Sequence, residues 1–96
     1  MEIKRTYNLG FLIIQARIND GFVVLTTNQA TITKQIYHLA KKQGRNVIYN
    51  ERTSSCVEYY EGLKAQEIEK IIDGEVVEAK GKAGEMVKKF GEKQKK

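Results

Sequence analysis

The chain has 96 residues, of which 41% are hydrophobic and 30% charged, and it contains one cysteine. This length and balance are typical of one folded domain with a single modest core, and they exclude a disordered chain. No apolar run approaches the roughly 18 residues that cross a bilayer, which excludes an integral membrane role. The N-terminus lacks the apolar core of a signal peptide, and Cys56 has no partner for a disulfide, so we expect a cytoplasmic protein.

The net charge of +5 is spread unevenly along the chain. Lys and Arg outnumber Asp and Glu by eight to four in residues 1–60 and by seven to four in residues 75–96, whereas residues 61–74 carry two against four. A basic body and a basic tail around an acidic segment favour a polyanionic partner such as DNA or RNA.

The first quarter of the chain predicts three strands joined by tight turns. Apolar and polar residues alternate weakly in residues 2–8 and strongly in residues 11–18, which places apolar side chains on one face. Asn8-Leu9-Gly10 and Asn19-Asp20-Gly21 read as the turns, because glycine supplies the positive φ angles that such turns require. Residues 22–27 then return antiparallel, and turn geometry is the best explanation for Asp20.

A helix is predicted next, with Thr27 or Asn28 as its N-cap and Gly44 as the residue that follows its last turn. Its apolar residues recur at helical spacing and form one stripe, which predicts packing against a sheet. The stripe consists of Ile32, Ile36, Leu39 and Ala40.

The second half of the chain predicts a hairpin and a second helix. Residues 45–50 and 55–60 read as its two strands. Residues 63–73 show helical spacing, and Gly74 is expected to end that helix. Residues 75–79 are a candidate short edge strand, and a final weak helix is indicated by the spacing of Ala83, Val87 and Phe90.

Together these elements predict an α+β fold over residues 1–80, followed by a basic, weakly helical or frayed tail over residues 81–96. The order β-β-β-α-β-β-α is that of a two-layer sandwich with helices on one face of a mostly antiparallel sheet. The alternative is a winged helix, with residues 28–42 as recognition helix and residues 45–60 as wing. That motif normally needs another helix directly before the recognition helix, and here a strand precedes it.

Basic groups near hydroxyl and aromatic side chains point to a nucleic-acid surface. Cations neutralise phosphates, hydroxyls can bond to them, and tyrosine rings stack on unpaired bases. One polar helix face and the hairpin supply such groups. The predicted nucleic-acid-binding residues are Lys34, His38, Lys41, Lys42, Arg45, Arg52, Ser54 and Tyr60.

Two enzymatic hypotheses are weaker. Cys56 with His38 could form a thiolate–base pair, although a mid-strand cysteine is more often a small buried hydrophobe. Glu78-Ala79-Lys80 with Asp73 resembles the carboxylates and lysine of a metal-dependent nuclease, but the pattern is too short to be specific. No cofactor or metal site is predicted.

The sequence therefore favours a small non-enzymatic nucleic-acid-binding protein, a regulator or an accessory subunit. The alternative is a protein-interaction or homodimerisation module, in which an exposed sheet edge or the Val87/Phe90 stripe makes the contact.

Overall fold

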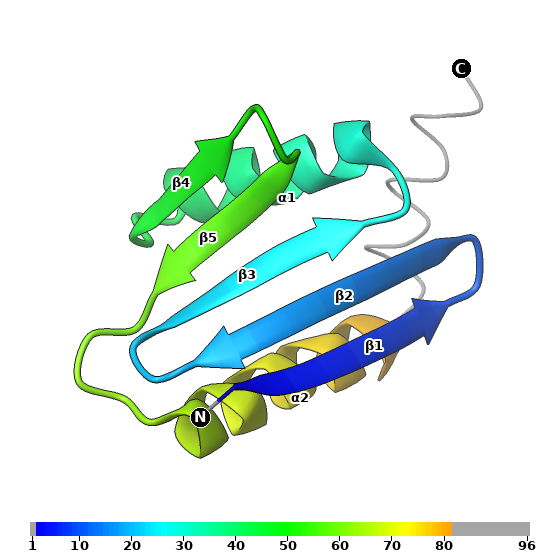
Figure 1. Ribbon diagram of the computed structural model, residues 1–96. Coiled ribbons are helices and arrows are strands. Elements are labelled where there is room, and N and C mark those ends of the chain that lie inside the picture. Colours follow the sequence, from blue (N-terminus) through cyan, green and yellow to red (C-terminus); the bar gives the residue numbers. More distant parts are fainter. Residues whose placement is uncertain (1, 82–96) are drawn as a thin grey trace.

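The computed structural model describes residues 2–81 (Figure 1). Five strands and two helices lie within this range. In chain order they are β1 (Ile3–Leu9), β2 (Leu12–Asn19), β3 (Phe22–Thr27), α1 (Ala30–Lys42), β4 (Val47–Asn50), β5 (Ser55–Tyr59) and α2 (Ala65–Gly81).

The five strands form one sheet in the order β1-β2-β3-β5-β4. Every neighbouring pair is antiparallel. Because β5 lies between β3 and β4, these two strands run in the same direction without pairing. The α+β class with an antiparallel sheet, predicted from the sequence, is confirmed.

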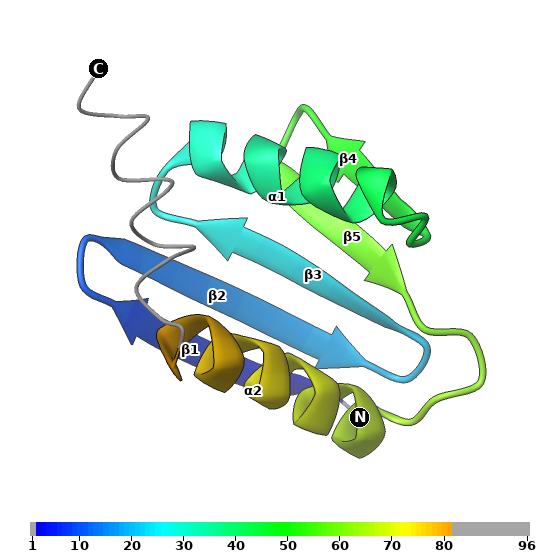
Figure 2. The ribbon, with the colours of Figure 1, turned by 180° about the vertical axis from the view of Figure 1, so that it is seen from behind.

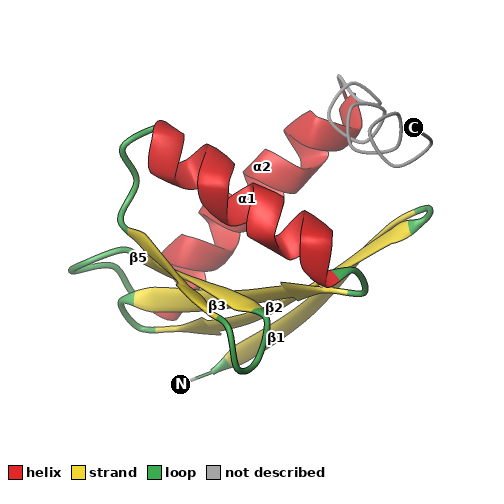
Figure 3. Ribbon diagram, turned by 90° about the horizontal axis from the view of Figure 1, so that it is seen from above, coloured by secondary structure: helices red, strands yellow, loops and turns green. Residues whose placement is uncertain are grey.

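Both helices cover the same face of the sheet, and no element within residues 2–81 covers the other face (Figures 2 and 3). α1 packs on β3, β4 and β5, whereas α2 packs on β1, β2 and β3. The segment directly before α1 is strand β3, where a winged helix would have another helix. Within residues 2–81, neither helix is long and apolar enough to cross a membrane.

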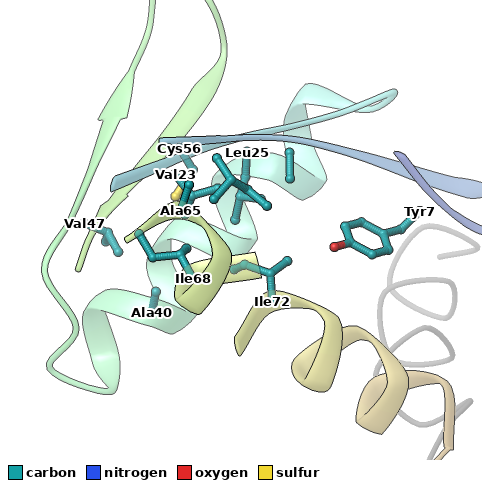
Figure 4. Packing of buried hydrophobic residues seen from close by; sticks show 11 residues of the cluster. Tyr7, Val23, Leu25, Ala40, Val47, Cys56, Ala65, Ile68 and Ile72 are labelled. Carbon is teal, nitrogen blue, oxygen red and sulfur yellow. The ribbon is translucent and has the colours of Figure 1, made fainter. Parts of the chain in front are cut away.

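The main core lies between the sheet and the two helices (Figure 4). Alternate residues of the strands point to this side because side chains in a strand project to opposite faces. Ile18, Val23 and Val47 come from the sheet, Ala40 comes from α1, and Ile68 comes from α2.

Glycines with positive φ make the reversals that the sequence predicts. Gly10 has φ of 82° and Gly21 has φ of 86°, and they join β1 to β2 and β2 to β3. Gly44, with φ of 79°, follows α1 as expected. This turn lets the Arg45 N–H donate to the Ala40 carbonyl at 3.0 Å, which sets the direction of the chain into β4.

The predicted N-cap of α1 is wrong. The N-cap is Gln29, which makes no side-chain capping bond. The Asn28 amide instead braces the start of β2: its Oδ1 accepts from the Ile13 N–H at 2.9 Å and its Nδ2 donates to the Phe11 carbonyl at 3.1 Å. The Thr27 hydroxyl accepts from the Gln29 N–H at 3.0 Å, one residue before the helix. Asn28 therefore makes tertiary hydrogen bonds to the start of β2 and does not cap α1.

The predicted end of the second helix is also wrong. α2 runs through Gly74 to Gly81, so residues 75–79 are helical and form no edge strand. A glycine inside a helix costs only about 1 kcal/mol relative to alanine, and Val76 packs against the main core beyond it. Packing past the glycine thus extends the helix. The stripe at Ala83, Val87 and Phe90, and the predicted tail after Gly81, lie outside the described residues.

Candidate nucleic-acid interface

The basic side of α1 is partly neutralised. Lys34 Nζ lies 3.2 Å from Glu51 Oε1, and it also stands 5.6 Å from the centre of the Tyr49 ring. His38, Lys41 and Lys42 are exposed. The predicted helix surface therefore keeps three side chains that face solvent, while its fourth is held by the neighbouring hairpin.

The hairpin residues do not gather in one place. Arg52 and Ser54 lie in the turn between β4 and β5, which the Lys34–Glu51 pair ties to the first half of α1. Arg45 precedes β4 and Tyr60 follows β5, so both lie at the opposite end of these strands. The eight predicted residues consequently form two or more groups and not one continuous surface.

Arg45 and Tyr60 surround a buried carboxylate. Glu58 is 3% exposed, and its Oε1 accepts hydrogen bonds from Arg45 Nη2 at 2.6 Å and from the Tyr60 hydroxyl at 2.9 Å. Arg45 Nε donates to Glu58 Oε2, and Arg45 Nη2 lies 3.2 Å from Glu75 of α2. Burial and the Glu58 carboxylate raise the pKa of Tyr60. These side chains form an ion-pair network that joins β5 to α2 and to the segment between α1 and β4.

A second polar cluster joins β1 to α2. The Tyr7 hydroxyl donates to Asp73 Oδ1 at 2.5 Å, and Arg5 Nη1 lies 2.8 Å from Glu69 and 3.3 Å from Asp73. Burial and the bond to Asp73 raise the pKa of Tyr7. Asp73, a candidate metal ligand from the sequence, is thus engaged by β1. Within residues 2–81, no three His, Cys, Asp or Glu side chains gather closely enough to share a metal ion.

Cys56 is a core residue. It is 1% exposed and lies among the apolar side chains of the main cluster (Figure 4). His38, by contrast, is exposed on α1. Burial raises the pKa of the Cys56 thiol to about 11. The thiol is therefore protonated at neutral pH, which contradicts its use as a nucleophile.

We expect Cys56 to resist thiol reagents in the folded protein. With a pKa of about 11 the thiolate is a roughly 10⁻³ fraction at pH 8, against roughly a quarter for an ordinary cysteine. Labelling with a chromogenic disulfide should be slow in buffer and complete within the mixing time in strong guanidinium chloride. Rapid labelling in buffer would show that the thiol is accessible. The thiol ionises near pH 8.5 in the unfolded chain but only near pH 11 in the folded protein. The contribution of Cys56 to the free energy of unfolding is therefore complete below about pH 8.5 and is lost as the pH rises to 11.

The uncovered side of the sheet, called the open face below, carries an aromatic pair that sequence reasoning did not assemble. Phe22 of β3 lies directly opposite Tyr59 of β5, and their ring centres are 6.4 Å apart with a tilt of 44°. Tyr59 is 42% exposed. Val24 and Val57 continue the apolar surface along the same two strands. The open face therefore presents rings and aliphatic side chains to solvent.

The other half of the open face is polar and basic. Lys4 of β1 lies opposite Arg17 of β2, and Arg17 in turn is the neighbour of Val24. Glu2 lies 3.2 Å from Arg17 and neutralises part of this charge. Two residues further along, a row of groups able to form hydrogen bonds crosses the strands. It contains Thr6, Gln15 and Thr26.

An open pocket of ≈ 390 Å³ lies where the aromatic pair reaches the end of the sheet. Its walls combine the two rings with backbone from two turns and three polar side chains. The lining residues are Asp20, Gly21, Phe22, Asn46, Tyr59, Glu61 and Gly62. The pocket is framed by backbone hydrogen bonds from Tyr59 N–H to the Asn46 carbonyl at 2.9 Å and from Tyr60 N–H to the Gly21 carbonyl at 2.8 Å.

The alternation of side chains between the two faces of each strand was the signal that could have identified the open face. In a strand, Tyr59 and Tyr60 must point to opposite sides, and Phe22 must share a side with Val24. The prediction from the sequence includes Tyr60 and omits Tyr59. The structure assigns Tyr60 to the ion-pair network and Tyr59 to the open face.

Comparison of the chain with protein-family models, with curated proteins and with solved structures finds no significant match.

Proposed function

We propose that this protein is a non-enzymatic nucleic-acid-binding protein that binds an unpaired strand of DNA or RNA across the open face. The observation that carries the proposal is the adjacent pair of rings, Phe22 and Tyr59, on a sheet face that neither helix covers. Exposed aromatic rings stack on unpaired bases, and each such stack contributes roughly 1–3 kcal/mol to binding.

The charges on the open face support the same function. Lys4 and Arg17 are directly opposite on neighbouring strands, an arrangement that is destabilising for like charges unless an anion offsets it. Glu2 offsets only one of the two positive charges. A phosphate would complete the compensation. The exposed cations of α1, Lys41 and Lys42, would add long-range attraction from the other layer of the molecule.

Fluorescence anisotropy with labelled single-stranded and duplex oligonucleotides tests the proposal. We expect single strands to bind more tightly than duplexes, and affinity to fall steeply with salt because neutralised phosphates release counterions. Tyr59→Ala should weaken binding roughly tenfold, as the loss of one base stack predicts. The matched control is Tyr49→Ala, which removes a tyrosine from the helix side of β4. Absence of binding at low salt would refute the proposed function.

The same samples distinguish a binding protein from a nuclease. We expect labelled strands to remain intact when Mg²⁺ or Mn²⁺ is added, because Asp73 is held by Tyr7 and Arg5 and is not presented to a metal. Cleavage that disappears in Glu78→Gln would show the opposite.

A homodimerisation module is the second candidate. Ile48 is exposed on β4, the short strand at one edge of the sheet, where a second copy could pair. Light scattering separates the two, since the monomer has a mass of 11.0 kDa. A stable dimer that Ile48→Lys dissociates, together with no affinity for oligonucleotides, would favour this second candidate.

A further inference from the structure

We infer that the pocket beside the Phe22–Tyr59 pair holds one unstacked base and selects guanine, an inference that rests on the proposed function. The open face alone offers stacking, which every base can provide. The pocket adds polar groups that could recognise one base in particular.

The aromatic wall gives the pocket its affinity for a flat ring. Phe22 and Tyr59 both line it, and they are the same two side chains that form the exposed pair on the open face. A strand lying on the sheet could therefore place one base at the end of β5 while its neighbours stack further along. Gly21 and Gly62 also line the pocket and add no side chain to it; their φ angles of 86° and 84° lie in the left-handed region that favours glycine.

Glu61 and Asn46 supply the selectivity. Neither side chain has a hydrogen-bond or ion-pair partner among the described residues, and both line the pocket. A carboxylate only accepts hydrogen bonds, and guanine is the base whose Watson–Crick edge presents two adjacent donors, N1–H and the 2-amino group. Adenine and cytosine present one amino group beside an acceptor, and uracil presents a single N–H between two carbonyls. The Asn46 amide can donate to the guanine 6-oxygen.

Asp20 has a structural task within the pocket. Its Oδ1 accepts from the Ala65 N–H at 2.9 Å, so it holds the start of α2 against the turn between β2 and β3. This leaves Glu61 as the carboxylate whose oxygens can both face a ligand.

The charges also set the direction in which a nucleotide enters. Two carboxylates, Asp20 and Glu61, repel a phosphate from the pocket itself. Arg17 lies on β2, the strand next to β3, two residues from the position paired with Phe22. The spacing between strands and the rise per residue place its Cα roughly 8 Å from the Cα of Phe22. The base therefore enters the pocket while its phosphate remains over Arg17 and Lys4.

The experiment compares two labelled strands, an oligouridine and the same strand with one central guanosine, by fluorescence anisotropy. A bidentate pair between a side chain and a base discriminates by roughly 1–3 kcal/mol, so we expect the guanosine strand to bind about tenfold tighter. Glu61→Gln should bring the two affinities within about twofold of each other. The matched control is Glu51→Gln, which removes the same charge from the turn between β4 and β5.

The outcomes separate the pocket from the proposed function. Oligouridine binding without a preference for guanosine would overturn the selectivity and leave the proposed function standing. A preference that survives Glu61→Gln would assign it to other residues and would also overturn the inference. Loss of binding to both strands in the unmodified protein would overturn the proposed function together with the pocket.

Discussion

Replacing Arg45 with methionine is expected to lower the free energy of unfolding by about 3 kcal/mol. The change leaves the Glu58 carboxylate, which is almost completely buried, without the guanidinium that donates to both of its oxygens. Removing one partner of a buried ion pair costs about 3–5 kcal/mol, and the partial exposure of Arg45 places this case at the lower end. Guanidinium chloride titration followed by circular dichroism measures the loss.

Two variants show whether the unpaired charge is the cause. Lys34→Met breaks the exposed pair with Glu51 and should cost less than about 1 kcal/mol. The double variant Arg45→Met/Glu58→Met should recover most of the lost stability, because apolar side chains of similar size often replace a buried ion pair with little cost. A double variant as unstable as Arg45→Met alone would show that the cost comes from lost packing.

Ile68→Ala is expected to destabilise the protein by about 3 kcal/mol, within the range measured for large-to-small changes in cores. Ile68 is 0% exposed and anchors α2 in the main cluster. The substitution removes buried methylene and methyl groups and leaves a cavity that the surrounding strands cannot fill by a small movement.

Ile71→Ala is the matched control on the same helix. Ile71 is 37% exposed, so the identical chemical change should cost less than about 1 kcal/mol. Thermal unfolding of both variants by calorimetry gives the comparison. Equal losses would mean that α2 does not dock through the face that contains Ile68.

Local chemistry explains which parts of the fold could be predicted from the sequence. The turn at Asp20-Gly21 and the end of α1 at Gly44 depend on positive φ angles, which glycine adopts readily and which the local sequence therefore indicates. The helix end at Gly74 could not be predicted, because Val76 packs beyond it and Tyr7 holds Asp73 from a strand far away in sequence. Contacts between residues this far apart in the sequence can be identified only once the relative positions of the strands and helices are known.

The residues of the candidate site were even harder to predict, because they come together only through the arrangement of the strands in the sheet. Charge selected Lys34 and Arg45, and an aromatic ring selected Tyr60, and the structure gives each of them a partner. Phe22 and Tyr59, by contrast, are good strand residues whose pairing depends on the register of β3 with β5. That register joins residues 37 positions apart, so no local pattern could indicate the exposed aromatic pair.

The position of β3 has a consequence for how the protein unfolds. α1 covers β3 and the strands on one side of it, and α2 covers β3 and the strands on the other. Each half of the molecule therefore buries the same central strand, whose Val23 and Leu25 would be exposed if either helix detached. The folding of the two halves is therefore coupled through one shared strand. The 80-residue unit is expected to melt in one cooperative transition, without an intermediate in which a single half persists.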